Sequence, residues 1–234
     1  MREHPRAAPP LLRVERVVKR FGGATVLNGI SLSLAVGESV GLTGPNGCGK
    51  TTLLDVISGF LRPERGRVWL WDRQISRWPP YRIIRAGVAR TFQVPHLSLR
   101  LTVEENLRAA MLHHRLRARD IRDGVDRILE LVGLQDLRGR EERTLSLGQV
   151  RRVEIARALA TRPRLVLLDE PFASLSPADA PEVLSVLRRL RRDRMTMLIV
   201  AHSPGLFRAV CDRVVAIEDG QATAGDRPAA APHA

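Results

Sequence analysis

The sequence predicts an α/β fold built on a parallel sheet, and three observations lead to this prediction. Residues 165–168 and 197–200 are continuous apolar runs, which are typical of parallel strands covered on both faces. Residues 44–49 form a glycine-rich turn between a short apolar run and a segment of helical character. Apolar positions in residues 102–137 recur at helical spacing. Strands and helices therefore alternate along the chain.

The glycine-rich turn is the most specific feature, because it fits the phosphate-binding pattern G-x-x-x-x-G-K-[ST]. Backbone amides of such a loop point at a phosphate, a lysine reaches the β- and γ-phosphates, and a hydroxyl ligates Mg²⁺. Residues 39–43 read as a strand, and residues 51–58 read as a helix ending at Gly59. The alternative is a chance match, which is disfavoured because the chain has two lysines against thirty-six arginines. The predicted nucleotide-binding residues are Gly44, Pro45, Asn46, Gly47, Cys48, Gly49, Lys50, Thr51 and Thr52.

Other segments complete the predicted order of elements. Residues 11–36 read as strands, with turns at residues 21–23 and at Asn28-Gly29, and residues 66–72 alternate like a strand that enters a turn. Residues 213–217 form the last predicted strand, and the chain from Gly220 onward, rich in alanine, proline and glycine, is expected to be loose.

The domain prediction follows from this order. Residues 1–10 are expected to form a disordered leader, since they contain no apolar core of a signal peptide. Residues 11–225 are expected to form one domain, with a helical insert at about residues 95–145. Residues 226–234 are expected to form a loose tail.

Composition limits the possible settings of this 234-residue chain. Hydrophobic residues make up 44% and aromatic residues 4%, so the core should be aliphatic. Two cysteines, Cys48 and Cys211, make no disulfide framework, which favours a reducing cytoplasm. No apolar run is long enough to cross a bilayer, so another chain would supply a membrane span. The net charge of +13 suggests nucleic acid or an anionic membrane surface, but the dispersed arginines favour simple compositional bias.

Two acids follow the apolar run of residues 165–168. A carboxylate at the end of a strand can reach Mg²⁺ beside bound phosphates, and Asp169 fits that role. Glu170 can polarise an attacking water. The alternative is a strand ended by acids for solubility, which becomes weak when the phosphate loop is considered together with them.

Three further positions carry chemistry only in combination with that loop. Gln93 can bind Mg²⁺ or water through a neutral amide, and His202 can donate a hydrogen bond to a γ-phosphate. Ser146 is placed to cap a helix whose free N-terminus can bind an anion. Each has a plain alternative: a surface glutamine, a structural histidine and ordinary helix capping. Capping alone would not require Gly148 and Gln149.

These motifs, in this order, resemble the ABC transporter ATPase family across nearly the whole chain. Residues 44–52 are similar to its Walker A loop, residues 145–149 to its signature sequence and residues 167–171 to its Walker B motif. Gln93 corresponds to the Q-loop glutamine and His202 to the switch histidine. Phe21 is similar in position to the aromatic that stacks on adenine, although it is also compatible with a packed loop residue.

The resemblance implies a P-loop NTPase (RecA-like) core with a small antiparallel β subdomain and an inserted helical subdomain. It also implies a second ATPase subunit, identical or related, so that Ser146, Gly148 and Gln149 contact ATP held by the partner. Lys50, Gln93, Glu170 and His202 would be catalytic, and Thr51, Gln93 and Asp169 would serve Mg²⁺. Transmembrane permease subunits and, indirectly, a solute-binding protein are the implied partners, at the cytoplasmic face of the inner membrane. Nucleic acid is not an expected partner.

Finer features are most similar to the ATPases of branched-chain amino acid importers, among them residues 20–23, 57–60, 87–93 and 149–159. Lipopolysaccharide exporters and urea importers have related ATPases, and a cytosolic nucleic-acid-associated ABC ATPase is an alternative of a different class. Three residues depart from the family pattern: Leu147 in the signature, Ser176 in the D-loop and Ser203 after the histidine.

Overall fold

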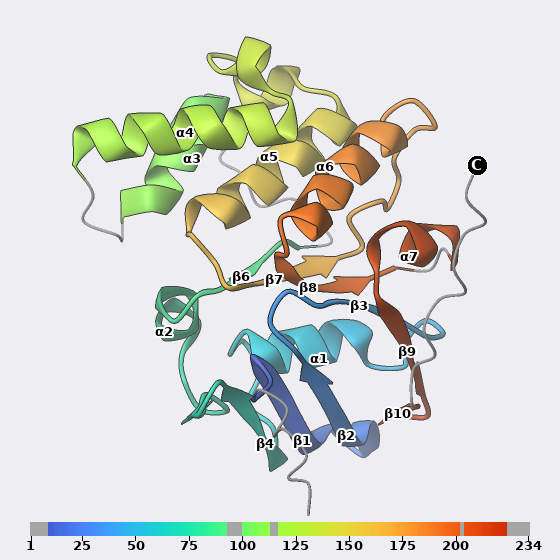
Figure 1. The fold of residues 1–234 in the computed structure, drawn as a ribbon. Helices are drawn as coiled ribbons and strands as arrows, with labels where there is room; N and C mark the ends of the chain where they lie inside the picture. Colours follow the sequence, from blue (N-terminus) through green and yellow to red (C-terminus); the bar gives the residue numbers. More distant parts are fainter. Residues whose placement is uncertain (1–8, 93–99, 113–116, 202–203, 224–234) are drawn as a thin grey trace, which may run out of the picture.

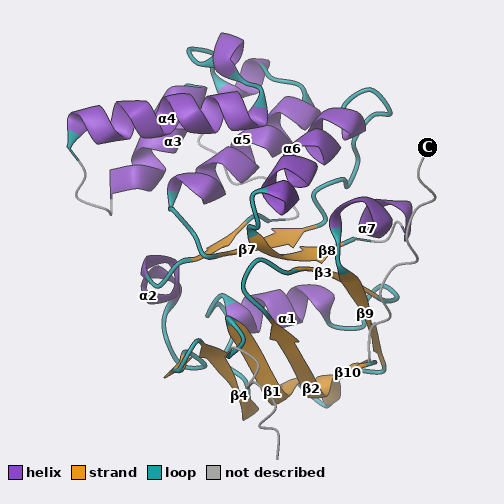
Figure 2. Ribbon diagram, in the orientation of Figure 1, coloured by secondary structure: helices purple, strands orange, loops and turns teal. Residues whose placement is uncertain are grey.

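The computed structural model describes residues 9–92, 100–112, 117–201 and 204–223. It has two sheets, with helix α1 between them and the other long helices over the outer face of the larger sheet (Figures 1 and 2). The helices are α1 (Lys50–Ile57), α2 (Pro80–Arg85), α3 (Val103–Met111), α4 (Ala118–Val132), α5 (Leu147–Ala160), α6 (Ala180–Arg192) and α7 (Pro204–Val210), with the 3₁₀ turns η2 (Gln135–Leu137) and η3 (Glu142–Thr144). The strands are β1 (Leu12–Phe21), β2 (Ala24–Leu34), β3 (Ser39–Thr43), β4 (Arg65–Leu70), β5 (Arg73–Gln74), β6 (Val88–Arg90), β7 (Leu165–Asp169), β8 (Thr196–Val200), β9 (Arg213–Glu218) and β10 (Gln221–Ala222).

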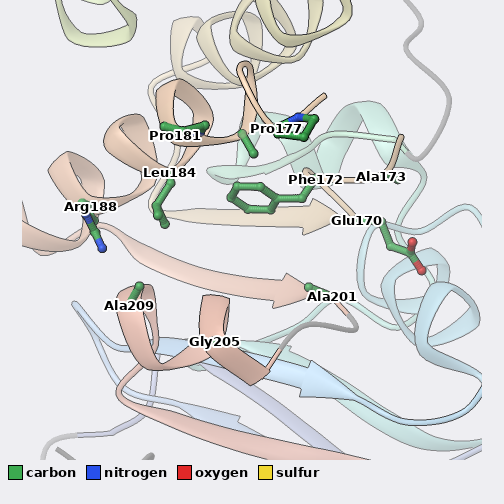
Figure 3. Close-up of a pocket in the computed structure, with 11 residues that line it drawn as sticks. Glu170, Phe172, Ala173, Pro177, Pro181, Leu184, Arg188, Ala201, Gly205 and Ala209 are labelled. Carbon is green, nitrogen blue, oxygen red and sulfur yellow. The ribbon is translucent and has the colours of Figure 1, made fainter. Parts of the chain in front are cut away.

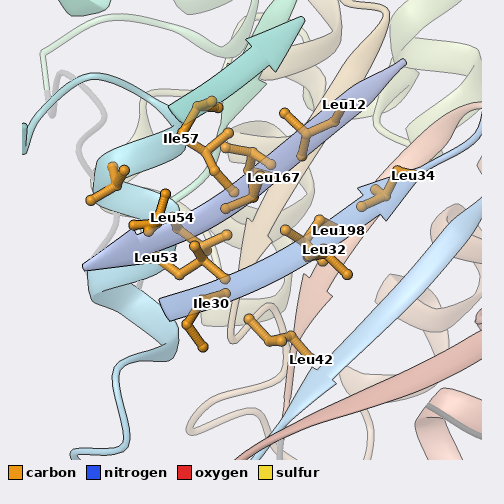
Figure 4. Packing of buried hydrophobic residues seen from close by; sticks show 14 of the residues in the cluster. Leu12, Ile30, Leu32, Leu34, Leu42, Leu53, Leu54, Ile57, Leu167 and Leu198 are labelled. Carbon is orange, nitrogen blue, oxygen red and sulfur yellow. The ribbon is translucent and has the colours of Figure 1, made fainter. Parts of the chain in front are cut away.

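The larger sheet has the strand order β10-β9-β3-β8-β7-β6, and all its pairings except β9 with β10 are parallel. Its central strands separate two hydrophobic cores. Leu167 and Leu198 belong to the core shared with α1 and the smaller sheet (Figure 4), whereas Leu168 and Ile199 belong to the core under the helices. Because successive side chains of a strand point to opposite faces, burial on both faces requires the continuous apolar runs seen in the sequence. The predicted α/β class is confirmed.

The smaller sheet is antiparallel, with the order β2-β1-β4-β5. The predicted turn at residues 21–23 is confirmed, because β1 and β2 form a hairpin that closes with Phe21 opposite Ala24. The predicted turn at Asn28-Gly29 is wrong, since both residues lie inside β2. Gly29 has φ 78° where the register skips a residue opposite β1, so this glycine forms a β-bulge within the strand.

The prediction of a loose chain from Gly220 is also wrong for its first residues. Gln221 and Ala222 form β10, which pairs with β9, and the Gly220 carbonyl accepts a 2.6 Å hydrogen bond from the Asn28 amide. This segment therefore connects the edge of the larger sheet to β2. Residues 224–234, like residues 1–8, lie outside the described part of the chain.

The predicted helical region of residues 102–137 contains α3, α4 and η2. Thr102 and Glu105 form a reciprocal capping box at the start of α3, which satisfies two amides that the helix itself cannot pair. Val103, Leu107 and Val125 pack into the same core as α5 and α6. In Figure 1, α3 and α4 lie beyond α5 from the sheet, so α5 is covered on both sides and is largely buried.

Cys211 follows α7 and is 1% exposed in the core under the helices. Burial raises the pKa of its thiol to about 12. Since only the thiolate reacts, alkylation of Cys211 at pH 8 is expected to be roughly 10³-fold slower in the folded protein than in the unfolded chain. Iodoacetamide labelling followed by peptide mass spectrometry measures both rates. Equal rates before and after unfolding would contradict this packing.

Candidate active site

The phosphate loop connects β3 to α1, and its glycines are required by both backbone and packing. Gly44 has φ 145° and Gly49 has φ 106°, which are conformations that residues with side chains rarely adopt. A Cβ on Gly44 would lie 2.3 Å from the carbonyl oxygen of Ile217, and one on Gly49 would lie 2.9 Å from that of Val26. A Cβ on Gly47 would meet no atom within 4 Å, so the loop is open there.

Gly44→Ala is therefore expected to lower the free energy of unfolding by about 3 kcal/mol, from backbone strain and overpacking together. For a chain of this size, that loss corresponds to a fall of roughly 10 °C in the melting temperature. Gly139→Ala is the matched control, because no atom lies within 4 Å of its added Cβ. Thermal unfolding measures both variants. Equal melting temperatures would show that the loop relaxes freely.

Lys50 is the first residue of α1 and is 6% exposed. Its ammonium donates hydrogen bonds of 2.9 Å to the carbonyl oxygens of Gly44 and Pro45. It also lies 3.8 Å from the Cys48 sulfur. These bonds keep the positive charge on the concave side of the loop, where a phosphate would be surrounded by backbone amides and the helix N-terminus.

Asp169 ends β7 with 1% of its side chain exposed. Its Oδ1 accepts a 3.4 Å hydrogen bond from the Thr51 hydroxyl, and its Oδ2 lies 3.0 Å from Nη2 of Arg90. Burial raises the pKa of Asp169, and the Arg90 charge opposes that rise. Arg90 in turn donates to Asp55 at 2.6 Å and to Ser58 at 3.0 Å. The strand end is thus attached to α1 on both sides of the carboxylate.

The Thr51 and Asp169 oxygens fit the chemistry of Mg²⁺, a hard cation that favours oxygen ligands and keeps phosphate oxygens in its shell. Among the described residues, no group of three or more histidine, cysteine, aspartate or glutamate side chains is able to hold a metal by itself. A cation here would therefore depend on phosphate or water oxygens to complete its shell, as Mg²⁺ bound together with a nucleotide does.

Glu170 follows with a left-handed backbone, φ 48°, which is uncommon outside glycine. Its amide donates to the Val200 carbonyl at 3.0 Å, so the turn is fixed against β8. Glu170 lies at one end of a cavity of about 590 Å³ whose walls include Phe172, Leu184 and Ala201 (Figure 3). No residue of the phosphate loop lines this cavity, so the cavity is separate from the phosphate position.

Ser146 and Gln149 form a capping box at the start of α5. The Ser146 hydroxyl accepts the Gln149 amide at 3.2 Å, and the Gln149 side chain accepts the Ser146 amide at 2.9 Å. Capping thus uses Gln149 as well, contrary to the expectation that it accounts for Ser146 alone. The hydrogen bonds that the described residues show for this pair do not reach residues 44–52. Within one chain, the two groups of predicted site residues are separate.

The remaining predicted site residues are placed only in part. Phe21 ends β1 and is 47% exposed, with the Lys19 ammonium 5.2 Å from its ring centre. The hairpin brings the neighbouring Val26 against Gly49, so this aromatic stands on the element that flanks the phosphate loop. Gln93 and His202 lie outside the described residues.

Arg90 was not among the predicted site residues, although it is buried beside Asp169 and its guanidinium lies 5.0 Å from the Phe92 ring centre. The one signal in the sequence is a charged residue at the end of the short strand β6, next to a residue that is itself three positions before Gln93. A single arginine in so arginine-rich a chain carries little weight, because its partners Asp55 and Asp169 are distant in sequence.

Known proteins match this arrangement. The family model described as ABC transporter matches residues 27–173. The branched-chain amino acid transport ATP-binding proteins BraF of Pseudomonas aeruginosa and LivG of Escherichia coli are 34% and 35% identical, and each match covers 94% of this chain and 92% of the relative. The lipopolysaccharide export ATP-binding protein LptB of Acidithiobacillus ferridurans is 34% identical over 93% of this chain and 90% of its own length.

Solved structures agree. An ATP-binding cassette of an ABC transporter in its ADP conformation is 32% identical, with a TM-score of 0.84 over 94% of this chain and 92% of its own. A dimeric cassette in a post-hydrolysis state, bound to ADP and Pi, is 25% identical, with a TM-score of 0.81 over 93% of this chain and 98% of its own. No helix in the described part of this chain has the length and apolarity to span a bilayer. With a matching family model and relatives of this identity, the chain belongs to the ABC transporter family, as an ATP-hydrolysing cassette.

Proposed function

We propose that this chain is the ATP-hydrolysing subunit of an importer for branched-chain or related amino acids. The observation that carries the proposal is the separation of two half-sites in one chain. The phosphate loop and Asp169 form one half, and the capped start of α5 at Ser146 forms the other. A complete site needs a second chain that supplies the missing half. The substrate class rests on the relatives BraF and LivG.

The chemistry proposed for the first half is attack of water on the γ-phosphate of ATP. Lys50 and the loop amides balance the phosphate charge, while Thr51 and Asp169 hold Mg²⁺, which neutralises the charge that develops on the phosphates. Glu170 takes the proton of the attacking water. Gln93 and His202 are assigned to the metal or water and to the γ-phosphate, respectively, on the family resemblance. The products are ADP and inorganic phosphate.

The second half is proposed to face ATP on a partner cassette. Ser146, Gly148 and Gln149 stand at a helix N-terminus, where backbone amides and the helix dipole favour an anion. Phe21 is proposed to stack on the adenine of the ATP held by its own chain. The structural relative that is dimeric with ADP and Pi supports a two-cassette arrangement. The partner is an identical chain or a related one.

The transport assembly is proposed on the same basis. Transmembrane permease subunits would supply the membrane span, and a solute-binding protein would act through them. The cassette would then sit peripherally on the cytoplasmic face of the inner membrane. We also propose that residues 11–225 form the single ATPase domain, with residues 95–145 as the helical insert that couples to the permease.

A lipopolysaccharide exporter is the second candidate, because LptB matches at nearly the same identity as BraF. The two assignments differ in the membrane chains that they require. Affinity purification of the tagged chain from detergent-solubilised membranes, with mass spectrometry of what co-purifies, decides between them. Salt-sensitive binding of the purified chain to DNA or RNA would instead favour a nucleic-acid role for its +13 charge.

The two-half site is tested by the mass in solution of Glu170→Gln, with and without Mg-ATP. Blocked hydrolysis should hold two cassettes around two nucleotides, so the monomer is expected to become a dimer only when ATP is present. Lys50→Ala in the same background is the control that should stay monomeric. A persistent monomer of Glu170→Gln at millimolar ATP would contradict a homodimer and direct attention to co-purifying ATPase chains.

A further inference from the structure

A carboxylate outside the predicted motifs joins two loops that are separate in sequence. Asp179 stands immediately before α6, and its Oδ1 accepts a 3.0 Å hydrogen bond from the Ser146 hydroxyl. Its Oδ2 accepts a 2.8 Å bond from the Ser176 hydroxyl, whose oxygen in turn accepts the Asp179 amide at 3.1 Å. We call Ser146, Asp179 and Ser176 the clasp. The clasp ties the start of α5 to the loop that follows Glu170.

The surroundings of Asp179 are shaped for this contact. A Cβ on Gly148 would lie 2.4 Å from the Cβ and 2.5 Å from Oδ1 of Asp179, so glycine at this position is what lets the carboxylate reach Ser146. The Asp179 side chain makes no capping hydrogen bond to α6. Its bonds to the two serines are therefore not a by-product of helix capping.

Counting protons shows what the contact means for a nucleotide. A serine hydroxyl has one proton to donate, and Ser146 directs it at Asp179 while its oxygen accepts the Gln149 amide. An ionised carboxylate and a phosphate oxygen both accept only. The single proton of Ser146 can therefore serve Asp179 or a phosphate, but not both. A carboxylate at this distance also repels a triphosphate that approaches Ser146.

We propose that Asp179 is a positioning residue that holds the Ser146 hydroxyl and raises the ATP concentration at which two cassettes close. This inference rests on the proposed contact of Ser146 with ATP on the partner. When the phosphate takes the Ser146 proton, the loop of residues 174–179 loses its tie to α5. That loop has room to move, because Pro177 and Ala180 line the cavity of about 590 Å³ beside Glu170 (Figure 3). Asp179 thereby supplies a carboxylate beside Ser176, where the family usually has one.

The test is an ATP titration of dimer formation by Asp179→Ala and Asp179→Asn, each combined with Glu170→Gln. Removing both the charge and the acceptor should lower the half-saturating ATP concentration by roughly three- to tenfold relative to Glu170→Gln alone, the range expected from one hydrogen bond. Asparagine keeps an acceptor without the charge and should fall between the two. Asp193→Ala is the matched control, because Asp193 ends the same helix at the opposite end from Asp179.

The outcomes separate this inference from the proposed function. An unchanged or higher ATP requirement in Asp179→Ala, with Glu170→Gln still dimerising, overturns the inference alone. If Glu170→Gln stays monomeric, the homodimer fails, and hydrogen exchange of the monomer decides the clasp. The amides of Ala173 and Leu175 bond to the carbonyls of Glu170 and Phe172, so Asp179→Ala should speed their exchange several-fold. Unaltered exchange rates there would overturn the clasp.

Discussion

Glu170→Gln is expected to lower the rate of ATP hydrolysis by about 10³-fold, since a positioned general base contributes roughly 10²–10⁴ to such a rate. The glutamine side chain has the same size but does not take a proton from water. ATP affinity should be retained, because Lys50 and the phosphate loop are unchanged. Steady-state phosphate release and binding of a fluorescent ATP analogue measure the two quantities separately.

Two further variants define this result. Lys50→Ala should lose both hydrolysis and affinity, because the ammonium would contact the phosphates in the bound state as well as in the transition state. Glu130→Gln is the matched control, an exposed glutamate on α4 whose substitution should leave turnover unchanged. Retained turnover in both Glu170→Gln and Lys50→Ala would refute the proposed mechanism.

Arg90→Met is expected to lower the free energy of unfolding by about 3–5 kcal/mol, the usual effect of removing one partner from a buried ion pair. The Arg90 side chain is 5% exposed, and its loss leaves the Asp169 carboxylate buried without an opposite charge. Asp55, which is 27% exposed, loses the same partner and is affected less. Thermal and urea unfolding measure the change.

The deficit of Arg90→Met should depend on pH. Burial raises the pKa of Asp169 above its ordinary value of 3.8, and removal of Arg90 removes the main opposing influence. A carboxyl group with a raised folded-state pKa stabilises the fold less as the pH rises from 3.8 through that folded pKa. The deficit should therefore be small in acid and grow toward neutral pH.

Two controls identify the cause. Asp169→Asn combined with Arg90→Met should show a much weaker pH dependence, because the titrating group is gone. Arg143→Met removes an exposed ion pair with Glu141, and such pairs contribute about 0–1 kcal/mol. If Arg90→Met and Arg143→Met had equal stability, Arg90 would not be needed to balance Asp169.

Local patterns in the sequence predicted the elements that place the site. The strand at residues 165–168 and the phosphate loop are specified by neighbouring residues, so the end of β7 and the start of α1 could be located without a structure. The bulge at Gly29 could not, because the same dipeptide favours a turn and only pairing with β1 keeps it in a strand. β10 was missed for the same reason, since its pairing depends on β9 and on Asn28.

The candidate site shows the same division. Thr51 and Asp169 were predicted and are adjacent in the structure, 118 positions apart in sequence. Arg90 and Asp179 were not predicted, because each acts through partners that no spacing rule connects. Buried charge and shared hydrogen bonds depend on tertiary packing, and a single sequence does not record which arginine or aspartate meets which partner.

The two faces of β7 have a consequence for how the chain tolerates changes in length. Leu167 faces α1 and Leu168 faces the helices, so the strand is read in alternate positions by two unrelated environments. Inserting or deleting one residue in this strand would exchange every later side chain between them and turn Asp169 away from Thr51. Evolution can therefore lengthen the connections around the catalytic strand, but the strand itself can change in length only by an even number of residues.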